Sequence, residues 1–109
     1  MIRNAMPMQK SNNIRGAFIT LEGGTGSGKS TQLKLLTEYL QSNGYDCVFT
    51  REPGGTAISE KIREIILDGN NAEEADETEA LLYAAARAQL VKELIIPSIK
   101  QGKIVVCDR

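Results

Sequence analysis

The stretch Gly23-Gly24-Thr25-Gly26-Ser27-Gly28-Lys29-Ser30 decides the fold of this chain. It follows a short apolar run, Ala17 to Leu21, and precedes an amphipathic segment that begins near Lys29. A glycine-rich loop between a strand and a helix is the context in which the pattern G-x4-G-K-S binds phosphate. Glycines let backbone N–H groups turn inward around an anion, and the following helix presents its positive end to it. The loop and the adjoining Thr31 therefore predict a nucleoside triphosphate site, with Lys29 on phosphate and Ser30 on Mg2+. A glycine-rich turn that binds nothing is the alternative.

The composition is that of an ordinary globular domain. The chain has 109 residues, of which 41% are hydrophobic and 25% charged, enough for one domain that is small for an α/β enzyme. A formal net charge of -1 gives no general attraction to nucleic acid or to an anionic membrane. No apolar run approaches the length of a membrane span. The absence of histidine excludes His-based triads and His metal ligands, and Cys47 and Cys107 lack CxxC spacing. Buried thiols in a reducing cytoplasm are therefore expected.

The order of apolar and amphipathic segments predicts an α/β fold, a parallel sheet with flanking helices. Residues 1–15 are polar and aperiodic, which indicates a flexible leader before a domain over residues 16–109. Strands are expected at about 17–22, 46–50 and 104–107. Helices are expected at 29–43, at about 58–69 and at 77–94. Pro97 is expected to interrupt the last pattern and to start a further turn or short helix that ends at Gly102. The acidic stretch 70–77 is expected to be a solvated loop.

Parallel strands open their ligand sites at their carboxyl ends, so residues after each strand should gather at one edge of the sheet. The second strand runs into Arg51-Glu52-Pro53-Gly54-Gly55-Thr56, and the third into Asp108-Arg109. Asp108 is a candidate second partner for the metal held by Ser30. Tyr83 and Arg87 are four residues apart, so they share one helix face and can act on one object. A surface ion pair for the loop charges, and an aromatic with a stacked cation for the helix pair, are the structural alternatives.

The combination resembles the thymidylate kinase family, P-loop enzymes that phosphorylate dTMP to dTDP with ATP. The resemblance covers about Gly16 to Arg109, and its most discriminating motifs are the Arg51–Thr56 loop and the Ala85-Ala86-Arg87-Ala88-Gln89 helix. The other matching pieces, in the family's order, are Phe18–Gly23, Gly28–Gln32, Thr50, Tyr83-Ala84 and Asp108-Arg109. A homodimer in the cytoplasm, with no nucleic-acid or membrane partner, is what the resemblance implies for the whole enzyme.

The resemblance also implies roles for single residues. The loop from Gly23 to Thr31 binds ATP, with Lys29 on its phosphates and Ser30 and Asp108 on or near the magnesium. Tyr83 stacks on thymine, Arg87 hydrogen-bonds the base and Pro53 packs beside the nucleotide. Arg51 and Arg109 contact the dTMP phosphate. Catalysis by Lys29, Arg51 and Arg109 is positioning and charge neutralisation, without a covalent nucleophile.

Two features depart from the family pattern. Thr25 stands where relatives carry an acid that contacts the sugar 3′-hydroxyl, and threonine can hydrogen-bond there only without charge. Gly26 occupies the place of the loop arginine of one family branch; in the other branch a mobile lid supplies that charge. The chain ends after the third strand, which predicts a truncated N-terminal portion of the kinase domain. We expect this portion to be inactive alone. We also expect an unpaired apolar edge on the strand from Phe18 to Leu21.

Two other functions stay open at this point. One is a different P-loop deoxynucleoside or nucleotide kinase, which would phosphorylate thymidine or another acceptor. The other is a non-enzymatic nucleotide-binding module, which would bind ATP but no monophosphate.

Overall fold

The computed structural model describes residues 2–3, 16–24 and 26–109. Four strands form one sheet in the order β1-β2-β4-β3: β1 (Ile2–Arg3), β2 (Ala17–Leu21), β3 (Cys47–Arg51) and β4 (Ile104–Asp108). The last three strands run parallel, whereas β1 pairs antiparallel with β2. The predicted parallel α/β sheet is thus confirmed, with β4, the last strand in sequence, between the other two long strands.

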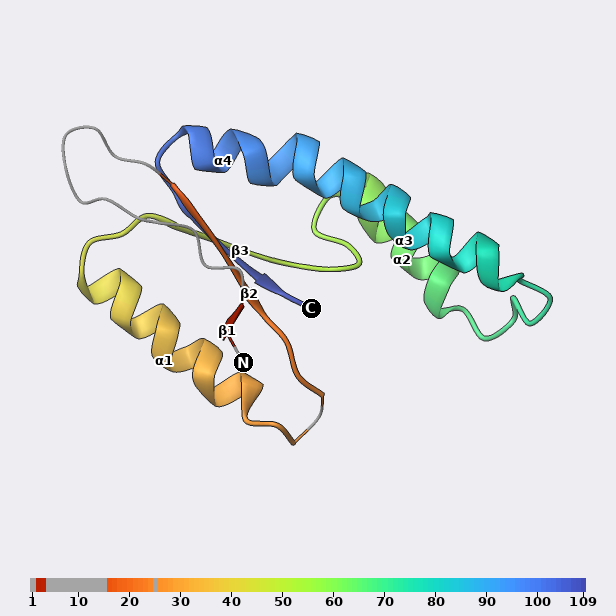
Figure 1. The fold of residues 1–109 in the computed structure, drawn as a ribbon, viewed down its shortest axis with the longest axis horizontal. Helices are drawn as coiled ribbons and strands as arrows, with labels where there is room; N and C mark the ends of the chain where they lie inside the picture. The colour runs from red at the N-terminus through yellow and green to blue at the C-terminus, as the bar shows by residue number, and fades with distance from the viewer. Residues whose placement is uncertain (1, 4–15, 25) are drawn as a thin grey trace.

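The helical elements are α1 (Lys29–Ser42), α2 (Ala57–Leu67), α3 (Asp76–Leu90), the π-helical turn η1 (Val91–Ile95) and α4 (Ile96–Lys100). Figure 1 shows α1 on one side of the sheet and the α3–α4 rod on the other. Two groups of buried side chains fill these interfaces. Leu40 of α1 packs with Ile19 and Val106 on one face, while Leu90 and Ile95 pack with Val105 and Cys107 on the other. A strand covered on both faces is apolar at most of its positions, which explains the apolar runs 17–19 of β2 and 104–107 of β4.

Pro97 lies at the start of a short helix, α4, as the sequence predicts, but no break separates α4 from the helical turns before it. Figure 1 shows α3, η1 and α4 as one continuous rod. A proline removes one helical hydrogen bond, and its ring collides with the carbonyl four residues earlier. Just before Pro97 the backbone N–H of Ile96 donates to the carbonyl of Val91, five residues back. This wider π turn accommodates the proline, so the chain continues in one direction.

The edge of β2 also differs from the expectation of an unpaired apolar strand. Ile2 and Arg3 pair with Leu21 and Thr20, so the carboxyl half of β2 has an antiparallel neighbour. The sequence of the leader carries no periodic signal, because two residues are too few to show one. The rest of the leader, residues 1 and 4–15, lies outside the described residues.

The second helix packs on α3 rather than on the sheet. Ser59 is fully buried and its hydroxyl donates to the carbonyl of Ala86 at 2.8 Å. The helix predicted from its isoleucines is present, but Ile58 and Ile65 are 50% and 47% exposed. Among the described residues, no helix is both long and apolar enough to cross a membrane.

Candidate nucleotide-binding site

The glycine loop lies between β2 and α1, as predicted. Gly26 and Gly28 have φ of 83° and 84°, a region that favours glycine. Ser27 closes a turn by donating its N–H to the carbonyl of Gly24 at 3.2 Å. A cavity of about 390 Å³ opens here, lined by Gly24, Gly26, Gly28, Lys29, Ser30 and Thr31. Because α1 begins at Lys29 with no side-chain cap, its first N–H groups are available to an anion in this cavity. Thr25 lies outside the described residues.

Lys29 reaches from this loop to the carboxyl end of β4. Its Nζ lies 2.7 Å from Oδ1 of Asp108 and donates to the carbonyl of Arg109 at 3.1 Å. The sheet register explains the meeting, because Leu21 of β2 and Arg51 of β3 are both direct partners of Asp108. The three loops that follow these strands therefore start at one level of the sheet.

Arg51 is held by Glu60, a residue that the sequence reasoning placed in no role. Its Nε and Nη2 donate to the Glu60 carboxylate at 3.3 and 2.5 Å, and the Gly55 N–H donates to Oε2 at 2.7 Å. The hydrogen bonds from Arg51, and then the one from Gly55, lower the pKa of Glu60 to about 2. Arg51, Glu60 and Asp108 share a cavity of about 660 Å³ over the end of β3. The sequence does not show this pairing, because Glu60 lies nine residues after Arg51, in the first turn of a different element, α2.

Tyr83, Arg87 and Pro53 lie around one cavity of about 250 Å³ that Glu52 also lines. Tyr83 is 42% exposed there. Arg87 uses Nε and Nη2 to donate to one oxygen of Glu52, at 2.9 and 2.6 Å, and this bonding raises the pKa of Arg87. Arg63 of α2 donates to the Pro53 carbonyl at 2.9 Å and so fixes this loop to α2.

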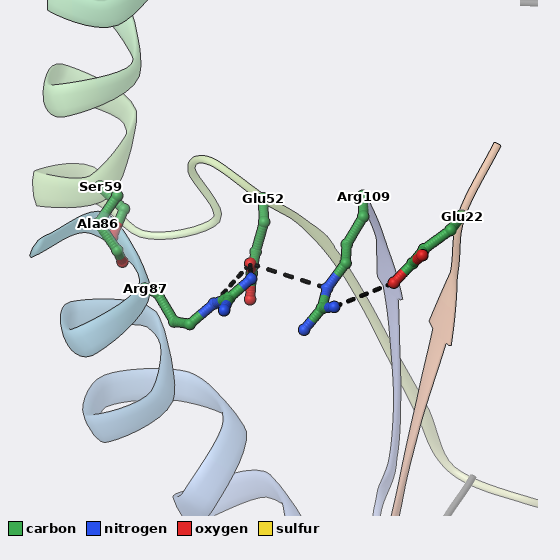
Figure 2. A network of polar contacts seen from close by, with 6 residues as sticks. All are labelled: Glu22, Glu52, Ser59, Ala86, Arg87 and Arg109. Carbon is green, nitrogen blue, oxygen red and sulfur yellow. Dashed lines mark hydrogen bonds and ion pairs between the residues drawn. The ribbon is translucent and has the colours of Figure 1, made fainter. Parts of the chain in front are cut away.

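Arg109 completes the edge of the site. Its Nη1 donates to Glu22 at 3.1 Å, and its Nε lies 3.9 Å from the same Glu52 oxygen that binds Arg87. Figure 2 shows Arg109 between these two carboxylates, with Arg87 reaching Glu52 from the helix on the other side. Glu52, Arg109 and Glu22 each follow or end a parallel strand, so the same register that aligns Asp108 aligns them.

The oxygen atoms of Ser30 and Asp108 suit magnesium, a hard cation that binds few protein ligands and relies on substrate phosphates and waters for the rest. Within the described residues, no group of three or more histidines, cysteines or carboxylates could hold a metal ion without such help. The hydroxyl and the carboxylate therefore fit a magnesium ion that arrives with a nucleotide.

A parallel sheet whose strand β2 feeds a G-x4-G-K-S loop into a helix defines the P-loop NTPase class of folds. The family model described as "Thymidylate kinase" matches residues 21–109. The chain belongs to the thymidylate kinase family.

Individual relatives agree with this assignment. A thymidylate kinase of Pelobacter propionicus is 64% identical over 94 residues, covering 86% of this chain and 43% of that protein. One from Desulfosudis oleivorans is 55% identical over 92 residues, covering 84% of the chain and 43% of that protein. The crystal structure of thymidylate kinase from Ehrlichia chaffeensis superposes with a TM-score of 0.73 at 43% identity, covering 87% of this chain and 53% of that one. The chain thus spans less than half the length of these curated relatives.

Proposed function

We propose that this chain carries the donor and acceptor sites of an enzyme that transfers the γ-phosphoryl group of ATP to dTMP, giving dTDP. The observation that supports this most directly is the common level of the three strand ends. It brings Lys29 of the glycine loop to within 2.7 Å of Asp108, beside the loops that bear Arg51 and Arg109. A donor phosphate in the glycine loop and an acceptor phosphate at the arginines would then lie on the same edge.

On the donor side, Lys29 binds the β and γ phosphates and the free N–H groups of α1 bind the same anion. Lys29 is paired with Asp108, so ATP competes with that carboxylate for the ammonium group. Ser30 and Asp108 would hold magnesium, which when bound neutralises phosphate charge and orients the γ-phosphoryl group.

On the acceptor side, the cavity between Pro53, Tyr83 and Arg87 holds the base. Tyr83 offers its ring for stacking, and Arg87 offers N–H donors to a carbonyl on the edge of thymine. Arg51 and Arg109 hold the dTMP phosphate, whose oxygen attacks the γ phosphorus in line while ADP leaves. Because no covalent enzyme intermediate is needed, these residues act by positioning and by neutralising charge.

Calorimetric titration with MgATP, dTMP, thymidine and dUMP tests this assignment. We expect Lys29→Met to weaken MgATP binding more than tenfold and to leave dTMP binding intact, and Arg87→Gln to do the reverse. Glu93→Gln, an exposed position on η1, serves as a control for both. Binding of ATP without dTMP would favour a non-enzymatic module, and a preference for thymidine over dTMP would favour a deoxynucleoside kinase.

We also propose that the enzyme works in the cytoplasm as a homodimer. Both cysteines are free, which suits a reducing compartment. Large apolar side chains are exposed on the paired helices α2 and α3: Ile58, Ile65, Leu67 and Leu81. Light scattering after size-exclusion chromatography would test the dimer, and Leu81→Glu should shift the mass toward that of a monomer if these helices form the interface.

A further inference from the structure

Glu52 is the central carboxylate of the polar network in Figure 2. Its side chain is only 10% exposed, and one of its oxygens, Oε2, faces two guanidinium groups. Arg87 approaches from α3 and Arg109 from the end of β4.

The contact with Arg87 fixes the plane of its guanidinium group. The N–H groups on Nε and Nη2 both donate to the same carboxylate oxygen, at 2.9 and 2.6 Å. Arginine has five such donors in a rigid fork, so binding one edge determines where the other edge points. The described residues supply no partner for Nη1, and Arg87 lines the cavity that also contains Tyr83. A donor group is therefore held ready at the proposed base site.

The two arginines depend on Glu52 unequally. Arg109 keeps its 3.1 Å contact with Glu22 if Glu52 is neutralised, and its contact with Glu52 is long, at 3.9 Å. Arg87 has no other acidic partner among the described residues. Loss of the Glu52 charge therefore frees the arginine at the base site and leaves the one proposed for the phosphate in place.

We propose that Glu52 is a positioning residue that orients Arg87 before the acceptor binds. It thereby selects pyrimidines with a carbonyl at position 4 over those with an amino group there. Thymine presents an acceptor oxygen at that position, whereas cytosine presents N–H donors that would face the arginine donors. A fixed arginine enforces this difference, and a mobile one can turn away from a cytosine. The inference rests on the proposed function, because it assumes that the cavity beside Tyr83 holds the base of a monophosphate.

The test compares Glu52→Gln with Glu93→Gln, a carboxylate-to-amide change at an exposed site whose side chain accepts a hydrogen bond from Gln89. Affinities for dTMP, dCMP and deoxyribose 5-phosphate are measured by calorimetry. We expect Glu52→Gln to weaken dTMP binding roughly tenfold or more and to change dCMP little, so that the dTMP/dCMP ratio falls about tenfold. Deoxyribose 5-phosphate and MgATP should bind as before. Glu93→Gln should leave all four affinities unchanged.

A double-variant cycle separates positioning from a general structural effect. If Glu52 acts through Arg87, then Glu52→Gln should add no further loss of selectivity to Arg87→Gln. An unchanged dTMP/dCMP ratio in Glu52→Gln, with dTMP still bound by the unsubstituted chain, would overturn this inference alone. Absence of dTMP binding by the unsubstituted chain would overturn the proposed function and this inference together.

A measurement on the unsubstituted chain covers the case in which Glu52→Gln does not fold. Nitrogen-15 NMR of the unliganded protein should show a resolved Nε–H signal for Arg87 with slowed rotation of its guanidinium group. It should show little further slowing when dTMP is added. An Arg87 signal that is averaged by rapid rotation until dTMP binds would contradict prior positioning by Glu52.

Discussion

Gly55 should be among the least replaceable residues of the chain. Its φ is 95°, in the region that favours glycine. A Cβ added there would overlap the Oγ1 of Thr50 and lie 2.7 Å from Cδ1 of Leu90. Leu90 is fully buried and packed against the sheet, so it has little room to move away.

The cost of Gly55→Ala can be worked from these two terms. The left-handed backbone costs a residue with a Cβ about 1–2 kcal/mol. Overpacking against side chains that cannot relax costs about 1–3 kcal/mol. We therefore expect the free energy of unfolding to fall by about 3 kcal/mol.

Urea unfolding followed by far-ultraviolet circular dichroism measures this change, since the chain has no tryptophan. Gly69→Ala is the matched control, because a Cβ at Gly69 meets nothing within 4 Å and its backbone is outside the left-handed region. The control should change the unfolding free energy by less than about 0.5 kcal/mol. Equal midpoints for the two variants would refute the reasoning.

Three further predictions concern single groups. The pKa of Glu60, lowered to about 2 from 4.5, means that its stabilising contacts are fully present above pH 4.5 and are lost as pH falls toward 2; Glu60→Gln should flatten this part of an acid-unfolding curve. Burial raises the pKa of Cys107 from 9.0 to about 12, so the free energy of unfolding should decline as pH rises from 9 toward 12. At pH 8 iodoacetamide should label Cys47 before the buried Cys107, as mass spectrometry would show. Ser59→Ala should cost about 1–3 kcal/mol in urea unfolding, because two buried hydrogen bonds of its hydroxyl, with the Ala86 carbonyl and with the Thr56 hydroxyl, are lost. A change below about 0.5 kcal/mol would contradict that role.

The elements with a strong local signal could be predicted from the sequence. The apolar runs of β2 and β4 and the glycine loop at the start of α1 each carry their pattern within a few residues. The helix at 29–43 was likewise predicted from its amphipathic pattern, and on α1 Leu40 is buried while Leu33 and Leu36 are half-buried. These features depend on neighbours in the chain, so the sequence shows them directly.

Features that depend on distant partners could not be predicted. The pairing of Ile2 and Arg3 with β2 has no periodic signal, and the course of the helix through Pro97 depends on a wider turn that begins at Val91. The second helix was predicted, but its packing partner was not: α2 packs through Ser59 against α3, and Ile58 and Ile65 are exposed.

The candidate site shows the same division. Motif and spacing indicated Lys29, Tyr83 and Arg87, and the fold brings the last two to one cavity. The carboxylates that hold the arginines were not identified. Glu52 and Arg87 are 35 residues apart in sequence, so their contact follows only from the packing of α3 against the second loop.

The π turn η1 also sets the angle between the side chains that α3 presents and those that follow Val91. Residues before Val91 present Tyr83 and Arg87 to the second loop, and residues after it pack Ile95 against the sheet. A regular α-helix advances roughly 100° per residue. Regular α winding over the same number of residues would turn Arg87 roughly 100° away from Glu52 while Ile95 stayed in the core. The one extra residue that the wider turn holds therefore sets the direction in which Arg87 faces.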